Sequence, residues 1–472
     1  MTELLNNPFL QLAAIIAGIL GSIPLLVAVY RYCIKSYHAT RERITSRIQH
    51  KYYRTMDTFE FINWRDCQLR KIYGNEYFTE IFGKCYPVFT IPFAEYYRYQ
   101  DFKKKNVYSK DDVQKDGYII EGGDVIFPPF LETEIMTSGS FIEIIRKKIL
   151  LNKYKKIVTQ SIKYPKLVGF SLDHYDRNEK GQITHIYPKL GTYEYNVYSS
   201  HILEFELFKA YKRLKGKMDI SVDKLWKYLP FRHYVHFGQG TTDLKHEALF
   251  SGARRYSLFS VQCIVVFKDK EHHDYRTLLM KRSTDPKKVA AKLGYYQFFP
   301  AGGFELYEKE LIHSISMIKE NYSLRKAIFR EYLEEVFNEN DFKGVQTDGN
   351  SETTDRILNH PQIVDITNMI EKGEASLNLL GIAVDLVSLR HEISFVLEIN
   401  NEEYSRKGFC PNDEFTRDNS VATKVRTPLP IVEKLLSGEG FSAEDAPMFN
   451  QASALLYKMY KDYKDGEPAT AL

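Results

Sequence analysis

The chain has 472 residues, which is long for one compact domain, and 44% of them are hydrophobic, enough for two or three buried cores. Its formal net charge of +4 is small for this length, so the composition gives no reason to expect a DNA partner. The five cysteines, at 33, 67, 85, 263 and 410, lack disulfide or metal-site spacing, which argues against a secreted scaffold and favours a cytosolic body.

Residues 9–30 form an uncharged apolar run. At about 1.5 Å per residue, a helix of this length can cross roughly 30 Å of hydrocarbon. The alternative is a secretory signal peptide, but the basic residues follow the run instead of preceding it, which favours a retained anchor. Because Arg31, Lys35 and Arg41 follow the run, we expect a single-pass protein of the cell inner membrane with its C-terminal domain in the cytoplasm.

Small residues recur at a spacing of four within this run, at Ala14, Gly18 and Ser22. Such a stripe lets two membrane helices approach closely, which would give a homo-oligomer. The sequence thus predicts a membrane anchor over residues 1–35.

Residues 36–240 are expected to form an α+β linking or sensing region. A helix is predicted over 140–158, where Ile142, Ile145, Ile149 and Leu150 share a face. Two alternating runs flank a polar loop within 167–187 and predict a β-hairpin.

The region 241–465 has a more specific order of elements. Strands are predicted over 260–269, 275–283 and 295–300, followed by the glycine pair Gly302 and Gly303. A helix is expected to begin near Ser323, with a buried stripe at Leu324, Ile328, Tyr332 and Val336. Two further strands are predicted over 379–389 and 391–399.

Three glutamates crowd this helix away from its apolar stripe. Glu331 faces both Glu334 and Glu335 at helical spacing, and like charges so placed repel each other. Hard cations such as Mg²⁺ prefer carboxylate oxygens, so a metal seat would explain the cluster. The alternative is an acidic face exposed to solvent.

The segment 302–337 resembles the box of the Nudix hydrolases, G-x5-E-x7-R-E-U-x-E-E-x-G-U, where U is a bulky apolar residue. Gly302 and Glu308 take the first glycine and glutamate, with five residues between them. Arg330, Glu331, Glu334 and Glu335 take the charged positions of the helix. The chain departs from the pattern by 21 residues between Glu308 and Arg330 where the family has seven, an insertion of 14, and by Phe337 at the closing glycine.

The resemblance implies a C-terminal α/β/α sandwich with a mixed sheet, and a chain of the α+β class overall. It implies hydrolysis of a nucleoside diphosphate linked to another group, with one to three Mg²⁺ or Mn²⁺ ions held by glutamates. Catalytic roles would then fall to Arg330, Glu331 and Glu335, metal binding to Glu308, Glu331, Glu334 and Glu335, and the shaping of the adjoining loop to Gly302 and Gly303.

Other residues are weaker candidates for this chemistry. The family often draws its general base from the box or from a later loop, which leaves Glu392 and Glu398 open as alternatives. Lys281 and Arg282 could contact phosphate, although a basic pair at a strand end is more often simply solvated.

The arrangement of anchor, linking region and hydrolase resembles the transmembrane Nudix effectors of bacterial anti-phage systems. That likeness implies a substrate such as NAD or ADP-ribose and a cyclic oligonucleotide as activator. The competing hypothesis is a catalytically silent Nudix fold that binds a nucleotide and controls a membrane segment.

Overall fold

The structure is a computed structural model. Apart from a few isolated positions, it describes residues 58–94, 97–98, 119–121, 124–126, 135–158, 168–238, 240–285, 292–306, 322–339, 357–412, 425–442 and 444–466. The chain divides into two compact units, Met1–Thr55 and Met56–Leu472, and the elements described below all belong to the second.

The described part of the chain contains helices both before and between the strands of the sheets. They are α3 (Phe59–Tyr73), α4 (Phe141–Val158), α5 (Tyr193–Asn196), α6 (Ile202–Leu214), α7 (Val222–Trp226), α8 (Pro230–Phe237), α9 (Lys245–Phe250), α11 (Leu324–Glu331), α13 (Pro361–Glu371), α14 (Leu429–Ser437) and α15 (Gln451–Asp465). Tighter or wider helical turns occur at η1 (Asn75–Tyr77), η5 (Val197–His201), η7 (Tyr332–Val336) and η9 (Glu402–Arg406).

A nine-stranded sheet forms the centre of the unit, with the order β12-β11-β10-β16-β15-β3 and with β13, β17 and β4 attached to its sides. Its strands are β3 (Val88–Ile91), β4 (Tyr97–Arg98), β10 (Ser260–Lys268), β11 (Tyr275–Lys281), β12 (Tyr296–Phe298), β13 (Ala301–Gly303), β15 (Ala375–Asp385), β16 (Arg390–Ile399) and β17 (Arg426–Pro428). The pair β10–β16 is parallel and the other pairs are antiparallel, so the sheet is mixed and the α+β class is confirmed.

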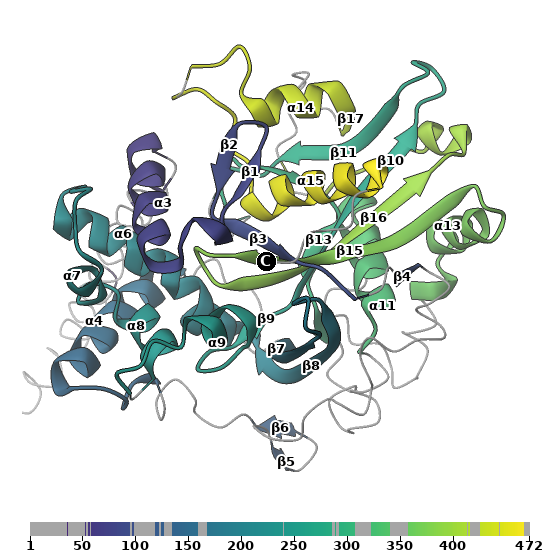
Figure 1. The fold of residues 1–472 in the computed structure, drawn as a ribbon. Coiled ribbons are helices and arrows are strands. Elements are labelled where there is room, and N and C mark those ends of the chain that lie inside the picture. Colours follow the sequence, from purple (N-terminus) through teal and green to yellow (C-terminus); the bar gives the residue numbers. More distant parts are fainter. Residues whose placement is uncertain are drawn as a thin grey trace, which may run out of the picture. The chain divides into compact units, whose positions relative to one another are not determined.

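Both faces of this sheet are covered because its strands are apolar on both sides. On one face, Ile264 and Val266 of β10 pack in a buried cluster with Leu455 and Leu456 of α15, which Figure 1 shows in yellow across the sheet. Cys263 points to the opposite face, where it lies beside Tyr332 of η7. Helix α11 and the turn η7 thus lie against the face of the sheet opposite α15, and the Nudix-type sandwich stays a prediction.

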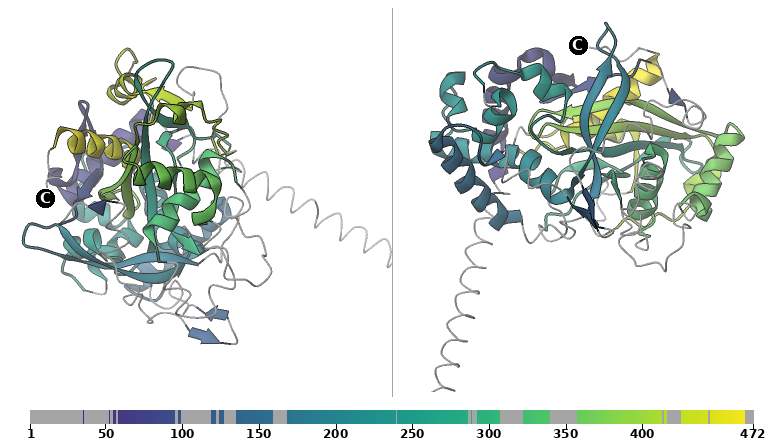
Figure 2. Two further views of the ribbon diagram at one scale, coloured as in Figure 1. Left: turned by 90° about the vertical axis from the view of Figure 1, so that its right-hand side faces the viewer. Right: turned by 90° about the horizontal axis from the view of Figure 1, so that it is seen from below.

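A smaller sheet of four strands has the order β14-β7-β8, with β9 also paired to β7. Its strands are β7 (Val168–Arg177), β8 (Ile183–Thr192), β9 (Ser257–Leu258) and β14 (Glu305–Leu306). The ribbon β7–β8 is the hairpin predicted over 167–187, and Figure 2 shows it in blue as a long two-stranded projection. Two-stranded ladders also form between β1 (Thr79–Ile81) and β2 (Lys84–Tyr86) and between β5 (Ile119–Glu121) and β6 (Asp124–Ile126).

Helices α3, α4, α6, α7 and α8 lie together beside the sheet (Figure 1). Glu206 of α6 accepts hydrogen bonds from the backbone N–H groups of Phe231 and Arg232 of α8, both at 2.9 Å, and its carboxylate lies 3.8 Å from Arg232 Nε. Arg232 in turn donates to the carbonyl of Leu386, directly after β15, at 2.9 Å. Residues from both sides of the domain boundary predicted at 240 therefore build one packed unit, and that boundary stays a prediction.

The helix predicted over 140–158 is confirmed as α4, but its orientation differs from the predicted face. Ile142, Ile145 and Ile149 are exposed, whereas Leu150, the fourth residue of the predicted face, is buried together with Leu151, Tyr154, Ile157 and Val158. Helix α4 packs on α6 and α8 through residues nearer its C-terminal end, where the apolar residues are denser. The choice of face was therefore decided by the neighbouring helices rather than by the isoleucine spacing.

No helix among the residues that the structure describes is both long and apolar enough to span a membrane. The longest of these, α4 with 18 residues, carries charges along its whole length, including Arg146, Lys147 and Lys155. The prediction of a single-pass inner-membrane protein is corrected accordingly. Residues 9–30, on which that prediction rested, lie outside the described part of the chain.

Candidate active site

The helix that carries the glutamates begins where the sequence predicts. Ser323 is its N-cap, and its hydroxyl accepts a hydrogen bond from the backbone N–H of Lys326 at 3.4 Å, which satisfies one unpaired donor of the first turn. Leu324, Ile328, Tyr332 and Val336 are all buried, so the predicted stripe is confirmed. The stripe fixes the rotation of the helix and thereby the direction in which the glutamates point.

The second half of the helix widens into the π-helical turn η7, which contains Glu334 and Glu335. Such turns are uncommon and are found frequently at functional sites. The helix ends at Phe337, and the next residue, Asn338, has a φ of 57°. Asparagine tolerates this left-handed conformation, so Asn338 supplies one position later the chain reversal expected of the missing glycine.

The glutamates do not form a solvated acidic face. Glu331, Glu334 and Glu335 are 5%, 2% and 4% exposed, and Arg330 beside them is 6% exposed. A buried carboxylate is costly unless a positive charge or hydrogen-bond donors compensate it. The contacts of these four side chains are therefore what decides their role.

Arg330 joins two backbone carbonyls to the carboxylate of Glu331. It donates to the carbonyl of Gly303 at 2.6 Å, to the carbonyl of Glu305 at 2.9 Å and to Glu331 Oε1 at 2.7 Å. The two carbonyls straddle the point where the chain leaves the large sheet as β13 and enters the small sheet as β14. A planar guanidinium suits this task because its donors are held in a fixed fork. Arg330 Nε also lies 3.8 Å from Glu334 Oε1.

Gly302 allows the carboxylate of Glu331 to approach the backbone of β13. A Cβ atom at position 302 would lie 2.0 to 2.5 Å from the two oxygens and the carboxyl carbon of Glu331, closer than atoms can pack. A side chain at position 302 would therefore displace the Glu331 carboxylate, so the constraint on this position comes from contact and not from backbone conformation. The sequence pattern found this residue, and the structure supplies the reason for it.

Glu335 lies at the same edge of the sheet. Its Oε2 accepts a hydrogen bond from the backbone N–H of Ala301 at 2.6 Å. Burial raises the pKa of Glu335 well above its ordinary value, and the charges of Glu331 and Glu414 raise this pKa further. The Ala301 N–H and Arg282 act in the opposite direction. Glu331 and Glu335 thus form a buried carboxylate pair with mutual repulsion.

Of the two basic residues at the end of β11, Arg282 belongs to this site. It donates to Gln297 Oε1 at 2.9 Å and to Glu414 Oε2 at 3.3 Å, and its charge lowers the pKa of Glu335. No hydrogen bond or ion pair joins the side chain of Lys281 to any described residue. The basic pair is therefore not simply solvated, since Arg282 faces the carboxylates.

The two candidates for a general base lie at opposite ends of β16. Glu392 is 7% exposed and pairs in register with Ser260, which also pairs with Gly303 of β13, so Glu392 is separated from Gly303 by two strand spacings, roughly 10 Å. Burial raises the pKa of Glu392. Glu398 lies six residues further along the strand than Glu392, where its Oε1 accepts a hydrogen bond from Lys464 Nζ of α15 at 2.9 Å. Only Glu392 is close to the carboxylate pair, and Glu308 lies outside the described residues.

This geometry can hold a divalent cation. The negative charge of Glu331 raises the pKa of the buried Glu335, and either a proton or a metal ion between the two side chains would relieve their repulsion. Glu331 and Glu335 fit that role, whereas Glu334 is turned toward Arg330. Asp269, Glu271 and His272 also bring potential ligand atoms within 4.8 Å of one another, but Asp269 there accepts from its own turn and from Arg276.

Comparisons with known proteins add little to this geometry. No protein-family model matches the chain, and no curated protein matches it. Among solved structures it is similar to the NUDIX domain of Shewanella oneidensis NrtR complexed with ADP ribose, at 11% sequence identity and a TM-score of 0.25. The match covers 44% of this chain and 90% of that chain. A likeness of this degree supports no argument about function, so the proposal below depends on the side chains of this chain.

Several residues of the site gave no signal in the sequence. Glu414 follows a strand by many residues, and nothing in its neighbourhood predicts that it would pair with Arg282. Tyr193 belongs to α5, far before the box, yet burial together with the charges of Glu305 and Glu414 raises its pKa to about 12. Arg390 lies 3.8 Å from Glu392 through the Oε1 atom of that carboxylate. The contacts of Glu414 and Tyr193 join segments that are far apart in the sequence, so no local pattern marks them.

Proposed function

We propose that this chain is a divalent-metal-dependent pyrophosphohydrolase of the Nudix type. Its substrate would be a nucleoside diphosphate linked to a second group, with an NAD-like dinucleotide favoured and ADP-ribose as the nearest alternative. The single observation that carries the proposal is the buried carboxylate pair Glu331 and Glu335, held against the glycine strand β13 by Arg330 and the Ala301 N–H.

The physical reason lies in the charge of the substrate. A phosphoanhydride is anionic and repels an attacking hydroxide, so its hydrolysis requires positive charge beside the phosphates and an activated water. Mg²⁺ or Mn²⁺, when bound, would supply both the charge and a more acidic water molecule. Glu331 and Glu335 would hold the ion, with Glu334 and Glu308 as further ligands that remain predictions.

The other residues would prepare the site. Arg330 holds Glu331 in one orientation, because the same guanidinium is fixed by the carbonyls of Gly303 and Glu305. Arg282 supplies positive charge near Glu335 and would contact a phosphate of the substrate. Glu392 is the nearer of the two candidates for a proton acceptor. The predicted role in antiviral signalling and the cyclic oligonucleotide activator remain predictions.

Turnover by the full chain tests the proposal. Purified protein is incubated with NAD, ADP-ribose and diadenosine polyphosphates in the presence of Mg²⁺, with and without cyclic nucleotides, and released mononucleotide is measured. We expect release from at least one substrate, and its loss in Glu331→Gln and Glu335→Gln. Tight nucleotide binding without turnover in every condition would instead support the alternative, a silent nucleotide-binding module.

A further inference from the structure

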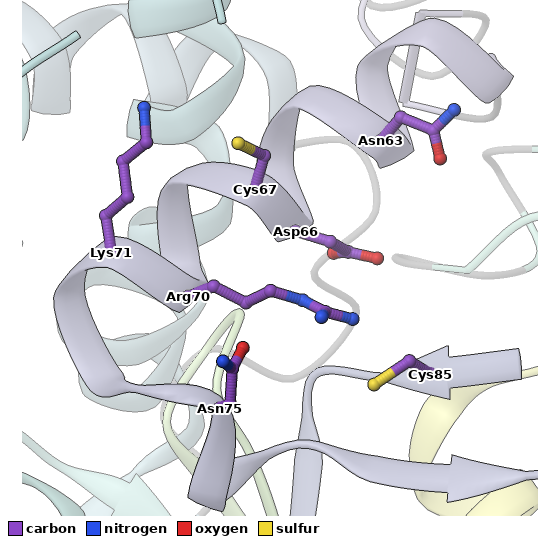
Figure 3. Close-up of a pocket in the computed structure, with 7 residues that line it drawn as sticks. All are labelled: Asn63, Asp66, Cys67, Arg70, Lys71, Asn75 and Cys85. Atoms are coloured by element: carbon purple, nitrogen blue, oxygen red, sulfur yellow. The ribbon is translucent and has the colours of Figure 1, made fainter. Parts of the chain in front are cut away.

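A hollow lies on the α3 side of the unit and shares no residue with the carboxylate site. It has a volume of about 570 Å³ and is lined by Asn63, Asp66, Cys67, Arg70, Lys71, Asn75 and Cys85. Ligand-binding cavities of proteins commonly fall between about 300 and 1,000 Å³. Figure 3 shows Asp66 and Arg70 extending from α3 toward the strand β2, which carries Cys85 on the opposite side.

The lining follows from the pattern of α3. Asn63, Asp66, Cys67, Arg70 and Lys71 recur at spacings of three and four, so they share one face of the helix. The remaining faces bury Phe61, Trp64, Gln68, Leu69 and Ile72. The polar face of α3 is open to solvent, and the strand β2 lies across from it, so the hollow is an open groove between the two elements.

Two of the charged residues already have partners. Lys71 Nζ donates to the carbonyl of Met218 at 2.6 Å and to that of Ile220 at 3.2 Å, and in Figure 3 it turns away from Arg70. Asp66 accepts from Arg65 Nε at 2.7 Å. Burial raises the pKa of Asp66, and the charge of Arg65 lowers it. These residues form the wall of the hollow more than its binding groups.

Arg70 is placed differently. Its guanidinium lies over the ring of Phe78, 4.7 Å from the ring centroid. Stacking holds the guanidinium plane but leaves its N–H edge available, and such a fork matches the two oxygens of a phosphate or a carboxylate. Within the described part of the chain, no side-chain hydrogen bond engages Arg70, Asn63 or Asn75.

We propose that the α3 hollow binds a small anionic polyol, with its anionic group on Arg70 and its hydroxyl groups on the amides of Asn63 and Asn75. Arg70 and Lys71 outweigh Asp66, so the lining carries net positive charge. Amide side chains both donate and accept hydrogen bonds, which suits hydroxyl groups. A phosphate ester and a sugar carboxylate share this chemistry, and the experiment separates them.

Calorimetric titration of the full chain tests the proposal with glucose 6-phosphate, gluconate and uncharged glucose as probes. We expect one of the two anions to bind and glucose to bind at least about tenfold more weakly, because a charged hydrogen bond is lost. The anion that binds identifies the group, phosphate or carboxylate. No binding of either anion at millimolar concentration, or equal binding of glucose, overturns the proposal.

Two further measurements locate the binding. Arg70→Gln is expected to weaken the anion at least about tenfold. The matched control is Arg406→Gln, which removes an exposed arginine that pairs with Glu403 on η9 and leaves the lining intact. Alkylation of Cys85, which is exposed, should slow when the anion is present. Binding that survives Arg70→Gln, or Cys85 alkylation that is unchanged at saturation, would show that the anion sits elsewhere. Neither result depends on hydrolysis at the carboxylate site.

Discussion

Replacement of Gly302 by alanine isolates the close approach between β13 and the helix carboxylates. The added Cβ would lie 2.0 Å from Glu331 Oε2 and 2.1 Å from its carboxyl carbon, whereas ordinary contact begins at 3.4 Å. The carboxylate must therefore move by about 1.4 Å, the difference between 3.4 and 2.0 Å. That movement breaks its 2.7 Å hydrogen bond to Arg330.

The expected effect is large for a single methyl group. A catalytic group displaced by about 1 Å can lose roughly 100-fold in rate. Loss of an orienting partner of a metal ligand costs about 10- to 100-fold in metal affinity. We therefore expect Gly302→Ala to reduce kcat for the best substrate roughly 100-fold and to weaken Mn²⁺ binding by at least about tenfold.

The matched control is Gly408→Ala, because a Cβ at position 408 would meet nothing within 4 Å. Both variants are measured by calorimetric Mn²⁺ titration, by turnover and by thermal unfolding. If Gly302→Ala binds Mn²⁺ and turns over substrate as well as Gly408→Ala does, the carboxylate of Glu331 is not part of the working site and the reasoning fails.

Three other predictions follow from the same contacts. The folded-state pKa of Glu335 is raised, so the stability that its proton provides is lost as pH rises from about 4.5 through that raised pKa. Glutamine carries no charge at any of these pH values. Without metal, Glu335→Gln should therefore unfold at a higher temperature than the parent protein at pH 7, and at the same temperature in acid. Arg282→Gln removes a charge that lowers the pKa of Glu335, so the pH midpoint of Mn²⁺ binding should move upward, and an unchanged midpoint would contradict this. Arg330→Lys leaves at least one of the carbonyls of Gly303 and Glu305 without a donor, which should lower the free energy of unfolding in denaturant by about 1–3 kcal/mol. An unchanged free energy of unfolding would show that the Arg330 hydrogen bonds do not stabilise the fold.

Much of the large sheet could be predicted from local pattern. The runs that became β10, β11, β15 and β16 are largely apolar and bounded by polar turns, and their ranges agree with the structure within a few residues. The helix carrying the glutamates was also predictable, because Ser323 caps it and its stripe has helical period. These features depend on neighbours in sequence.

The remainder depends on contacts between distant segments. The exposed face of α4 was mispredicted because the isoleucine spacing says nothing about which helices pack on it. Glu414 and Tyr193 reach the site from segments that are distant in the sequence, Glu414 through its pairing with Arg282, and no local pattern marks them. The glutamates themselves were predicted as a cluster, but their burial follows from β13 closing over them, which the sequence of the helix alone could not show.

The most direct test is a Mn²⁺ titration of the full chain followed by electron paramagnetic resonance, in the parent protein and in Glu331→Gln, Glu335→Gln and Glu433→Gln. Glu433 lies on α14, where it bonds Tyr457, and serves as the carboxylate control. The carboxylate-pair assignment predicts bound Mn²⁺ in the parent and in Glu433→Gln, and a loss of that signal in both box variants. Equal Mn²⁺ binding in all four proteins, or none in the parent even with nucleotide present, would contradict it.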